Sequence, residues 1–308
     1  MHDKFYTQTS ERPDLAAIPV NQPEGYIGGR ILPVVPVSEK SGTIYYATVT
    51  DDVAAQTNRS TGSGPDATQI ANSSTTYTAA EACKRGRVSP DEAKTMGGIE
   101  KADMVGAKFA KRSVMKAREA AIAALTLGKA SAITFDAAKF LTQAQDALNS
   151  VRRYSGKAVL YGGTKTLRAA VQALLNEKIT AGALSRVVSG TSPAVAVTGL
   201  GFKQWMDALA FLIGVDEVLP GDDEVWSAGD LAEKIGVAKI SDGSDPLDYK
   251  SEPVIGKTFQ FMPDGEQEFV IQSVGDRVNV NNLYDAYAWY NAKLLNTGAN
   301  VTIGGVAG

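Results

Sequence analysis

Lys165 lies directly after a pair of glycines at a predicted strand-to-helix turn, the position at which a phosphate-binding loop carries its lysine. Such a loop needs four residues between its first glycine and a Gly-Lys-Ser/Thr run. Here Thr164 separates Gly163 from Lys165, and five residues lie between Gly156 and Gly162. We therefore interpret the glycines as the end of a strand and Thr164 as the cap of the next helix.

Three consecutive carboxylates, Asp222, Asp223 and Glu224, follow a Pro-Gly pair and are of the residue type that holds Mg²⁺ or Ca²⁺. Consecutive side chains point in divergent directions, and the spacing is not that of an EF-hand. We favour a solvated turn, and the sequence predicts no metal and no cofactor.

Cysteine and histidine chemistry is nearly absent, because the chain has one cysteine, Cys83, and one histidine, His2. One cysteine cannot form an internal disulfide, and one histidine beside the initiating methionine does not build a zinc site or a Ser-His-Asp triad. No general acid/base pair or nucleophile motif is recognisable either. We therefore predict no catalytic residues and no enzyme activity.

The composition is that of a globular chain of 308 residues, with 44% hydrophobic and 21% charged residues. A net charge of -3 argues against a protein that coats nucleic acid through a basic face. The longest uncharged apolar stretch, Ala208 to Val215, is far shorter than the ~20 residues that span a bilayer. No apolar signal core opens the chain, so we expect a cytoplasmic protein without a membrane segment.

The elements that would position any functional residue begin with an extended stretch over residues 1–40, which holds five of the 12 prolines. It also carries apolar residues that a solvated linker would not need, namely Ile27, Ile31, Leu32, Val34 and Val35. Residues 41–85 are rich in Ser and Thr, and TIYYATVT and ANSSTTYT read as two strands of a long hairpin. An isolated hairpin is marginally stable, so the sequence predicts that this ribbon is either disordered or ordered by another molecule.

A long amphipathic helix is predicted from Ile99 to Leu125, where no proline occurs. Its packing face is expected at spacings of three and four, on Ala107, Ala110, Val114, Ala117 and Ala121. The opposite, solvated side is expected to carry Lys108, Lys111, Arg112, Lys116 and Glu119.

An α/β module is predicted next, with strands at 157–161 and 194–198 and a further short strand from Val215 to Leu219. Its helices present the core residues Leu167, Val171, Leu174, Phe202, Met206 and Leu209. Beyond Gly236 the chain turns β-rich, with a hairpin expected around Pro263-Asp264-Gly265 and a terminal strand in NVTIGGVAG.

Taken in order, these elements resemble the major capsid protein of tailed bacteriophages, the family that shares its fold with encapsulin shells. The most specific stretches are VRRYSGKAVLYGGTKTLRAAVQALL and FKQWMDALAFLIGVDEVLPGDDEVW. The resemblance implies an α+β chain with the Hong Kong 97-type capsid fold. It divides the chain into an N-arm (1–40), an E-loop (41–85), a peripheral domain with a spine helix (86–150), an axial domain (151–245) and a β-rich return with a C-terminal strand (246–308).

The resemblance implies a non-enzymatic subunit that self-assembles through pentamers and hexamers into an icosahedral shell. That shell encloses double-stranded DNA without sequence-specific binding; it is a virion component assembled in the host bacterial cytoplasm. A separate scaffolding protein, a portal and decoration proteins are the expected partners. Contacts between subunits are expected from the N-arm and E-loop at Ile27, Ile31, Leu32, Val34, Val35, Ile44, Tyr45, Tyr46, Val49, Ile70 and Tyr77.

One departure concerns the covalent crosslink that some relatives form from an E-loop lysine. No lysine occurs between Lys40 and Lys84, so we expect no crosslink by that route. Two other functions remain open from the sequence. One is an encapsulin-like nanocompartment shell, and the other is a monomeric small-ligand binding or transferase module on residues 151–240.

Overall fold

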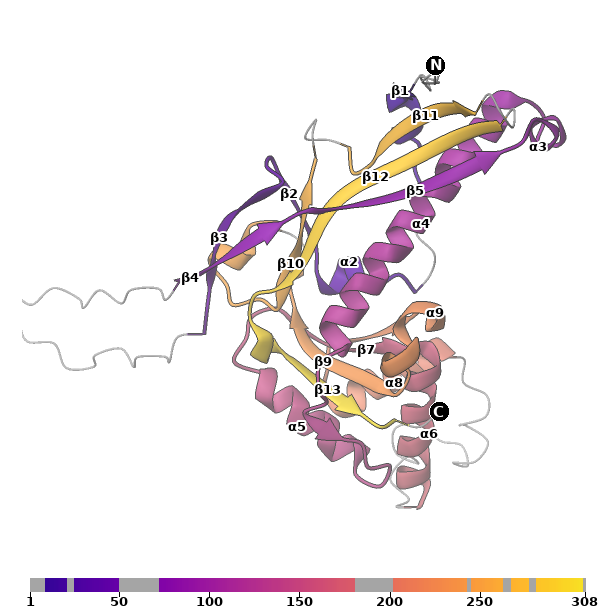
Figure 1. Cartoon of the computed structure of the whole chain (residues 1–308). Helices are drawn as coiled ribbons and strands as arrows, with labels where there is room; N and C mark the ends of the chain where they lie inside the picture. Colours follow the sequence, from indigo (N-terminus) through magenta and orange to yellow (C-terminus); the bar gives the residue numbers. More distant parts are fainter. Residues whose placement is uncertain are drawn as a thin grey trace, which may run out of the picture.

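The computed structural model describes residues 9–20, 25–49, 72–180, 202–242, 245–262, 267–276 and 281–306, and the account below concerns these. Within them the chain is a mixed α+β structure, with one sheet beside a long helix and a second sheet surrounded by shorter helices (Figure 1). The helices are α1 (Pro13–Ala16), α2 (Gly28–Ile31), α3 (Pro90–Thr95), α4 (Ile99–Leu127), α5 (Phe140–Val151), α6 (Thr164–Thr180), α8 (Phe202–Ile213) and α9 (Asp223–Trp226), with 3₁₀ turns η2 (Gly229–Leu231), η3 (Asp248–Lys250) and η4 (Thr297–Ala299).

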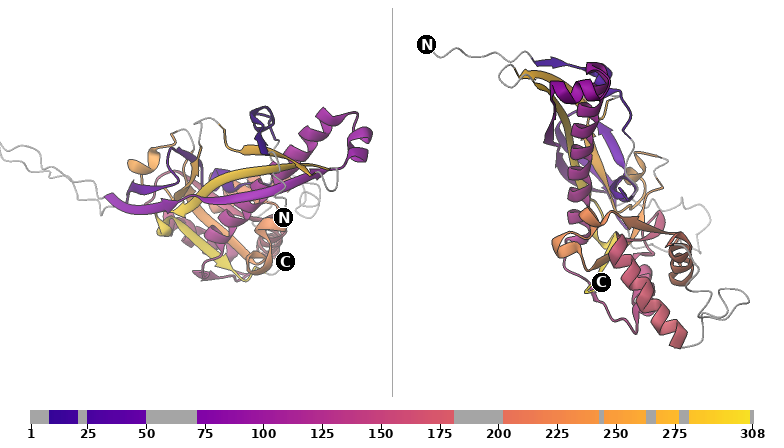
Figure 2. Two further views of the ribbon diagram at one scale, coloured as in Figure 1. Left: turned by 45° about the horizontal axis from the view of Figure 1, so that its top comes forward. Right: turned by 90° about the vertical axis from the view of Figure 1, so that its right-hand side faces the viewer.

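The larger sheet is organised around β12 (Asn281–Leu294), a strand of 14 residues. One edge of β12 pairs with β5 (Ala80–Val88), and the other pairs first with β11 (Val270–Asp276) and then with β10 (Gly256–Phe261). Two outer strands complete it, β1 (Thr9–Glu11) beside β11 and β2 (Val34–Val37) beside β10. The left view in Figure 2 shows β5 and β12 running together along the sheet.

The hairpin predicted between Phe259/Phe261 and Phe269/Ile271 is wrong, because β10 and β11 do not pair with each other. Each pairs with a different stretch of β12: Phe261 lies opposite Trp289, and Val270 lies opposite Tyr287. A turn signal is local, whereas this pairing is decided by a strand that follows later in the chain.

Helix α4 lies along the larger sheet because glycines let its backbone approach closely. A Cβ built on Gly86 of β5 would meet the Gly106 carbonyl oxygen at 2.3 Å, and one on Gly106 would meet the Tyr284 ring at 2.6 Å. The first half of the helix buries Ala107, Ala110 and Val114 against this sheet.

The inner face of α4 departs from the expected stripe in its second half. Ala117 and Ala121 are exposed, and the buried positions continue at intervals of four, as in Lys111, Met115, Glu119, Ala123 and Leu127. A row of fours winds around a helix of 3.6 residues per turn. The buried row therefore leaves the sheet and reaches α2 and α9, and it takes Lys111 and Glu119 inward from the side where solvation was expected.

The second sheet has the order β6 (Ile133–Thr134), β13 (Asn300–Gly304), β9 (Lys234–Ile240), β7 (Lys157–Gly163) and β8 (Glu217–Gly221). Helices α5, α6 and α8 pack around it and share one core with it. Of the expected core residues, Leu167, Val171, Met206 and Leu209 are buried and Phe202 is half-buried. The Leu174 side chain and the expected strand at 194–198 lie outside the described residues.

The N-terminal segment from 25 to 40 packs on its own chain. Ile27, Ile31 and Leu32 are buried in the core that α4 and the second sheet share, and Val35 is buried where β2 pairs in parallel with β10. The expectation that neighbouring subunits bury these residues is therefore wrong for these four. Only Val34 of that set is half-buried.

Candidate assembly surfaces

The glycine-lysine turn at the end of β7 is closed by a carboxylate. The Lys165 backbone N–H at the start of α6 donates to Asp223 Oδ1 at 2.7 Å, and Thr164 Oγ1 donates to the Gly221 carbonyl at 2.8 Å. A Cβ on Gly163 would lie 1.7 Å from Ser227 Oγ. The positive end of α6 thus faces a side chain of the same protein where a phosphate would otherwise lie.

The three consecutive carboxylates point to three different partners. Asp222 Oδ1 accepts the Glu224 backbone N–H at 3.1 Å and caps α9, Asp223 faces α6 and Ser227, and Glu224 pairs with Lys116 of α4. Among the residues that the structure describes, no group of three or more His, Cys, Asp and Glu side chains is arranged to hold a metal ion. These carboxylates join elements of the fold.

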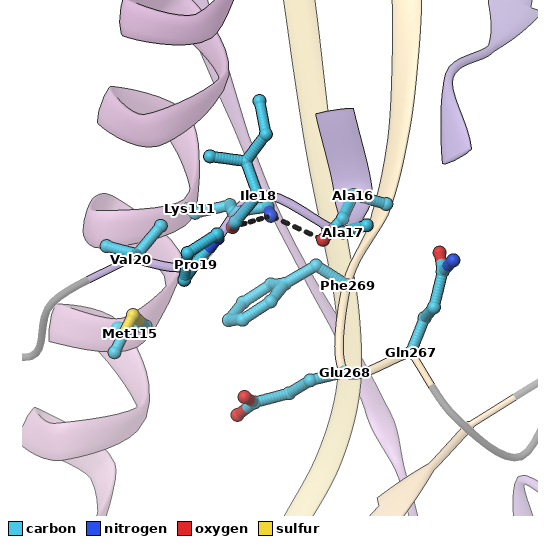
Figure 3. Close-up of a pocket in the computed structure, with 10 residues that line it drawn as sticks. All are labelled: Ala16, Ala17, Ile18, Pro19, Val20, Lys111, Met115, Gln267, Glu268 and Phe269. Atoms are coloured by element: carbon cyan, nitrogen blue, oxygen red, sulfur yellow. Dashed lines mark hydrogen bonds between the residues drawn. The ribbon is translucent and has the colours of Figure 1, made fainter. Parts of the chain in front are cut away.

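A pocket of about 480 Å³ lies between the N-terminal segment, α4 and the start of β11 (Figure 3). Lys111 lines it and is 2% exposed, and its Nζ donates to the carbonyls of Ala16 at 2.6 Å and Ile18 at 2.9 Å. Burial lowers the pKa of this ammonium group to about 8. Through these two hydrogen bonds the lysine holds residues 16–18 against α4.

Glu119, eight residues further along α4, holds two other segments. Its Oε1 accepts the Gly28 backbone N–H of α2 at 2.7 Å and the Trp226 Nε1–H of α9 at 2.8 Å. Burial raises the pKa of this carboxyl group, although both hydrogen bonds favour its charged form. One carboxylate thus joins α2 of the N-terminal segment, the long helix α4 and helix α9.

A buried trio joins the start of β10 to η3. Lys257 is fully buried, and its Nζ lies 2.7 Å from Asp248 Oδ1 and 3.0 Å from Ser241 Oγ. The lysine is paired with a carboxylate, and Ser241 donates to the same Asp248. The trio thus joins β10, η3 and the residue after β9 through one buried ion pair and its hydrogen bonds.

Lys257 was not singled out from the sequence, and Lys111 and Glu119 were assigned to the solvated side of the helix. Their charge argued against burial, although both continue the row of fours that starts at Ala107. For Lys257 no comparable signal exists, since its partner Asp248 lies in a turn whose position only the fold determines.

Within the described residues the ribbon forms a separate two-stranded sheet. It consists of β3 (Ser41–Ala47) and β4 (Asn72–Thr78), which pair with each other in register from Ser41↔Thr78 to Ala47↔Asn72. At its base Ile44 and Tyr77 are buried, and Tyr77 stacks on Phe259 with ring centroids 5.3 Å apart. Figure 1 shows these two strands at the side of the larger sheet, away from the second sheet.

Of the remaining contact residues expected on the ribbon, Tyr45 faces solvent, whereas Tyr46 and Val49 pack partly against the core. Tyr45 is 64% exposed, and Tyr46 and Val49 are half-buried. Ile70 lies outside the described residues. A tyrosine with most of its ring in solvent is an available contact for another molecule, because buried aromatic rings dominate interfaces between proteins.

None of the described helices is long and apolar enough to cross a membrane. The sequence matches no protein-family model, and no curated protein is similar to it.

Solved structures, by contrast, match nearly the whole chain. A phage-related protein from Bordetella bronchiseptica is 16% identical, with a TM-score of 0.64 over 97% of this chain and 100% of that chain. The capsid of cyanophage P-SCSP1u is 9% identical, with a TM-score of 0.56 over 94% and 91%. The holo-SrpI encapsulin complex from Synechococcus elongatus is 11% identical, with a TM-score of 0.53 over 94% and 93%.

Because the match covers nearly the whole chain, it includes the N-terminal segment and both sheets in their order along the sequence. It is therefore not limited to one module. At these identities the likeness establishes the fold, and it confirms the resemblance predicted from the sequence at that level. The chain has the α+β fold shared by phage capsid and encapsulin shell structures.

Proposed function

We propose that this chain is the subunit of an icosahedral shell, the major capsid protein of a tailed phage or prophage, and that it has no enzymatic activity. The full-length likeness to capsid structures carries the proposal. The described side chains support it, because the titratable groups of Asp223, Glu119 and Lys257 join elements of the fold.

In this proposal the chain has the Hong Kong 97-type organisation, with residues 1–40 as N-arm, 41–85 as E-loop and 86–150 as the peripheral domain with the spine helix. Residues 151–245 form the axial domain, and residues 246–308 form the β-rich return with the C-terminal strand. The β3–β4 ribbon supplies contacts between subunits through Tyr45, Tyr46 and Val49. Closed symmetric shells repeat each such contact many times, so contacts that are weak singly hold the assembly. Pentamers and hexamers, a scaffolding protein, a portal and decoration proteins complete the proposed assembly around double-stranded DNA.

The test replaces residues 50–71 with an Asn-Gly turn, which keeps β3 and β4 paired and leaves Tyr77 on Phe259. We expect this variant to remain folded by circular dichroism and thermal unfolding, and to form no shells by negative-stain microscopy. The unaltered chain, expressed alone or with its candidate scaffolding partner, is the control. Shells formed by the shortened variant would contradict a role for the E-loop segment 50–71 in assembly, and a persistent monomer of the unaltered chain would contradict the proposed function.

An encapsulin-like nanocompartment is the second candidate, because an encapsulin matches with a TM-score of 0.53 over 94% of this chain. The contents of purified particles separate the two. Double-stranded DNA in particles from the native source supports the capsid, and a protein cargo without a genome supports the nanocompartment.

A further inference from the structure

The outer side of helix α4 presents a stripe of cations and apolar side chains, here called the outer stripe: Lys101, Val105, Lys108, Phe109 and Arg112. Their intervals of three and four place them on one face of the helix. Phe109 is 59% exposed and Val105 is 46% exposed, whereas Ala107 and Ala110 on the opposite face are buried. A large apolar ring with most of its surface in water indicates an interaction site when charged groups surround it.

The cations of the outer stripe have no counterion in the part of the chain that the structure describes. No carboxylate lies within ion-pair distance of Lys101, Lys108 or Arg112 there, whereas Lys116, the next cation along this side, pairs with Glu224. The outer stripe is therefore a positively charged surface whose cations are not paired within the described chain. A negatively charged partner would supply the missing carboxylates.

We infer that the outer stripe is a docking surface for an acidic amphipathic helix of a partner protein. The inference rests on the proposed shell function, in which a separate assembly partner is expected. The cations lie seven and four residues apart, which is about 10 Å and 6 Å along a helix. A second helix lying alongside can place carboxylates at the same spacings and an apolar row over Val105 and Phe109.

The apolar residues decide between a protein partner and nucleic acid. A phosphate backbone would engage Lys101, Lys108 and Arg112 but would leave Phe109 in water, because the bases of a duplex are stacked inside it. A partner helix can cover the Phe109 ring with its apolar face and at the same time pair its carboxylates with the three cations. Exposed ion pairs contribute little each, so most of the affinity is expected from the buried ring, and the charges set the register and the partner.

The experiment measures fluorescence anisotropy of a labelled 22-residue helical peptide with a leucine row flanked by glutamates at spacings of seven and four. The full chain is titrated into it at low and at moderate salt. We expect saturable binding that weakens at least tenfold in K108E/R112E and at least fivefold in F109S. The matched control is K84E/R87E, which reverses two exposed cations on β5 and should bind as the unaltered chain does.

A charge swap makes the result specific. A peptide in which lysine replaces each glutamate should bind K108E/R112E and fail to bind the unaltered chain. Equal loss of binding in K84E/R87E, no saturable binding, or displacement of the peptide by an equimolar 20-base-pair duplex would overturn the inference. Shell assembly of the unaltered chain is scored separately: shells without peptide binding refute the docking surface alone, and peptide binding without shells refutes the proposed function alone.

Discussion

Three charged residues on the inner face of α4 bind the segments that pack across this helix. Lys111 holds the carbonyls of residues 16 and 18, Arg118 pairs with Glu268 and donates to Gln260, and Glu119 accepts from Gly28 and Trp226. A buried charge is costly unless hydrogen bonds compensate it, so a segment that loses its contact would leave an uncompensated charge behind. These side chains therefore select one arrangement of the N-terminal segment over others.

Lys111 predicts a pH dependence of stability with a definite sign. Its pKa is about 8 in the folded chain and 10.5 for an ordinary lysine. Between those values the unfolded chain keeps the proton that the folded chain has released, so this group makes the free energy of unfolding rise with pH, by up to roughly 3 kcal/mol. We expect Lys111→Met to remove this rise between pH 7.5 and pH 10, measured by urea unfolding.

Lys101→Met is the control for that measurement, because Lys101 is an exposed lysine on the outer side of the same helix. It should leave the pH dependence in place. The same rise with pH in Lys111→Met as in the unaltered chain would show that the lysine is not the group responsible.

At the scale of elements, the contact between α4 and the larger sheet depends on the missing side chain of Gly106. A Cβ there would lie 2.6 Å from the Tyr284 ring and 2.9 Å from Val88 Cγ2. We expect Gly106→Ala to destabilise the chain by about 1 to 3 kcal/mol through overpacking, even though alanine is the better helix former by ~1 kcal/mol.

The control for the Gly106 variant is Ala121→Gly at an exposed position of the same helix, which reports helix propensity alone. Thermal unfolding of both variants gives the comparison. Gly106→Ala with the stability of the unaltered chain, or greater, would mean that helix and sheet are not in the close contact described.

Local elements could be predicted where local chemistry specifies them. The long helix from Ile99, the strands around TIYYATVT and ANSSTTYT and the terminal strand follow from propensity and periodicity. The buried face in the second half of α4 could not be predicted, because the charged residues Lys111 and Glu119 interrupt the apolar periodicity of the sequence. The β10–β11 arrangement could not be predicted either, since both strands pair with β12, which follows them in the sequence, and not with each other.

At the scale of the whole molecule, the N-terminal segment from 25 to 40 and the ribbon that follows it belong to two structural contexts. Ile31 and Leu32 are fully buried in the chain's own core, and Thr258 Oγ1 donates to the Leu32 carbonyl at 2.9 Å across 226 positions of sequence. The periodicity of the sequence does not indicate a parallel pairing of β2 with β10 at that separation. The sequence therefore predicted that neighbouring subunits bury these apolar residues. The ribbon that follows has an exposed Tyr45 and a base tied to Phe259, and it remains the proposed contact with other subunits.

This division predicts opposite outcomes for two alanine variants. Leu32→Ala should destabilise the unassembled chain by about 2 to 5 kcal/mol, the usual cost of truncating a buried leucine, at any protein concentration. Tyr45→Ala should leave the unfolding of the unassembled chain unchanged within ~0.5 kcal/mol and reduce the yield of shells. Urea unfolding in dilute solution measures the first quantity, and sedimentation of assembled particles measures the second. The opposite result would be an unassembled Leu32→Ala chain that is as stable as the original but no longer assembles. It would mean that the N-terminal segment is ordered by contacts with other subunits and not by the core of its own chain.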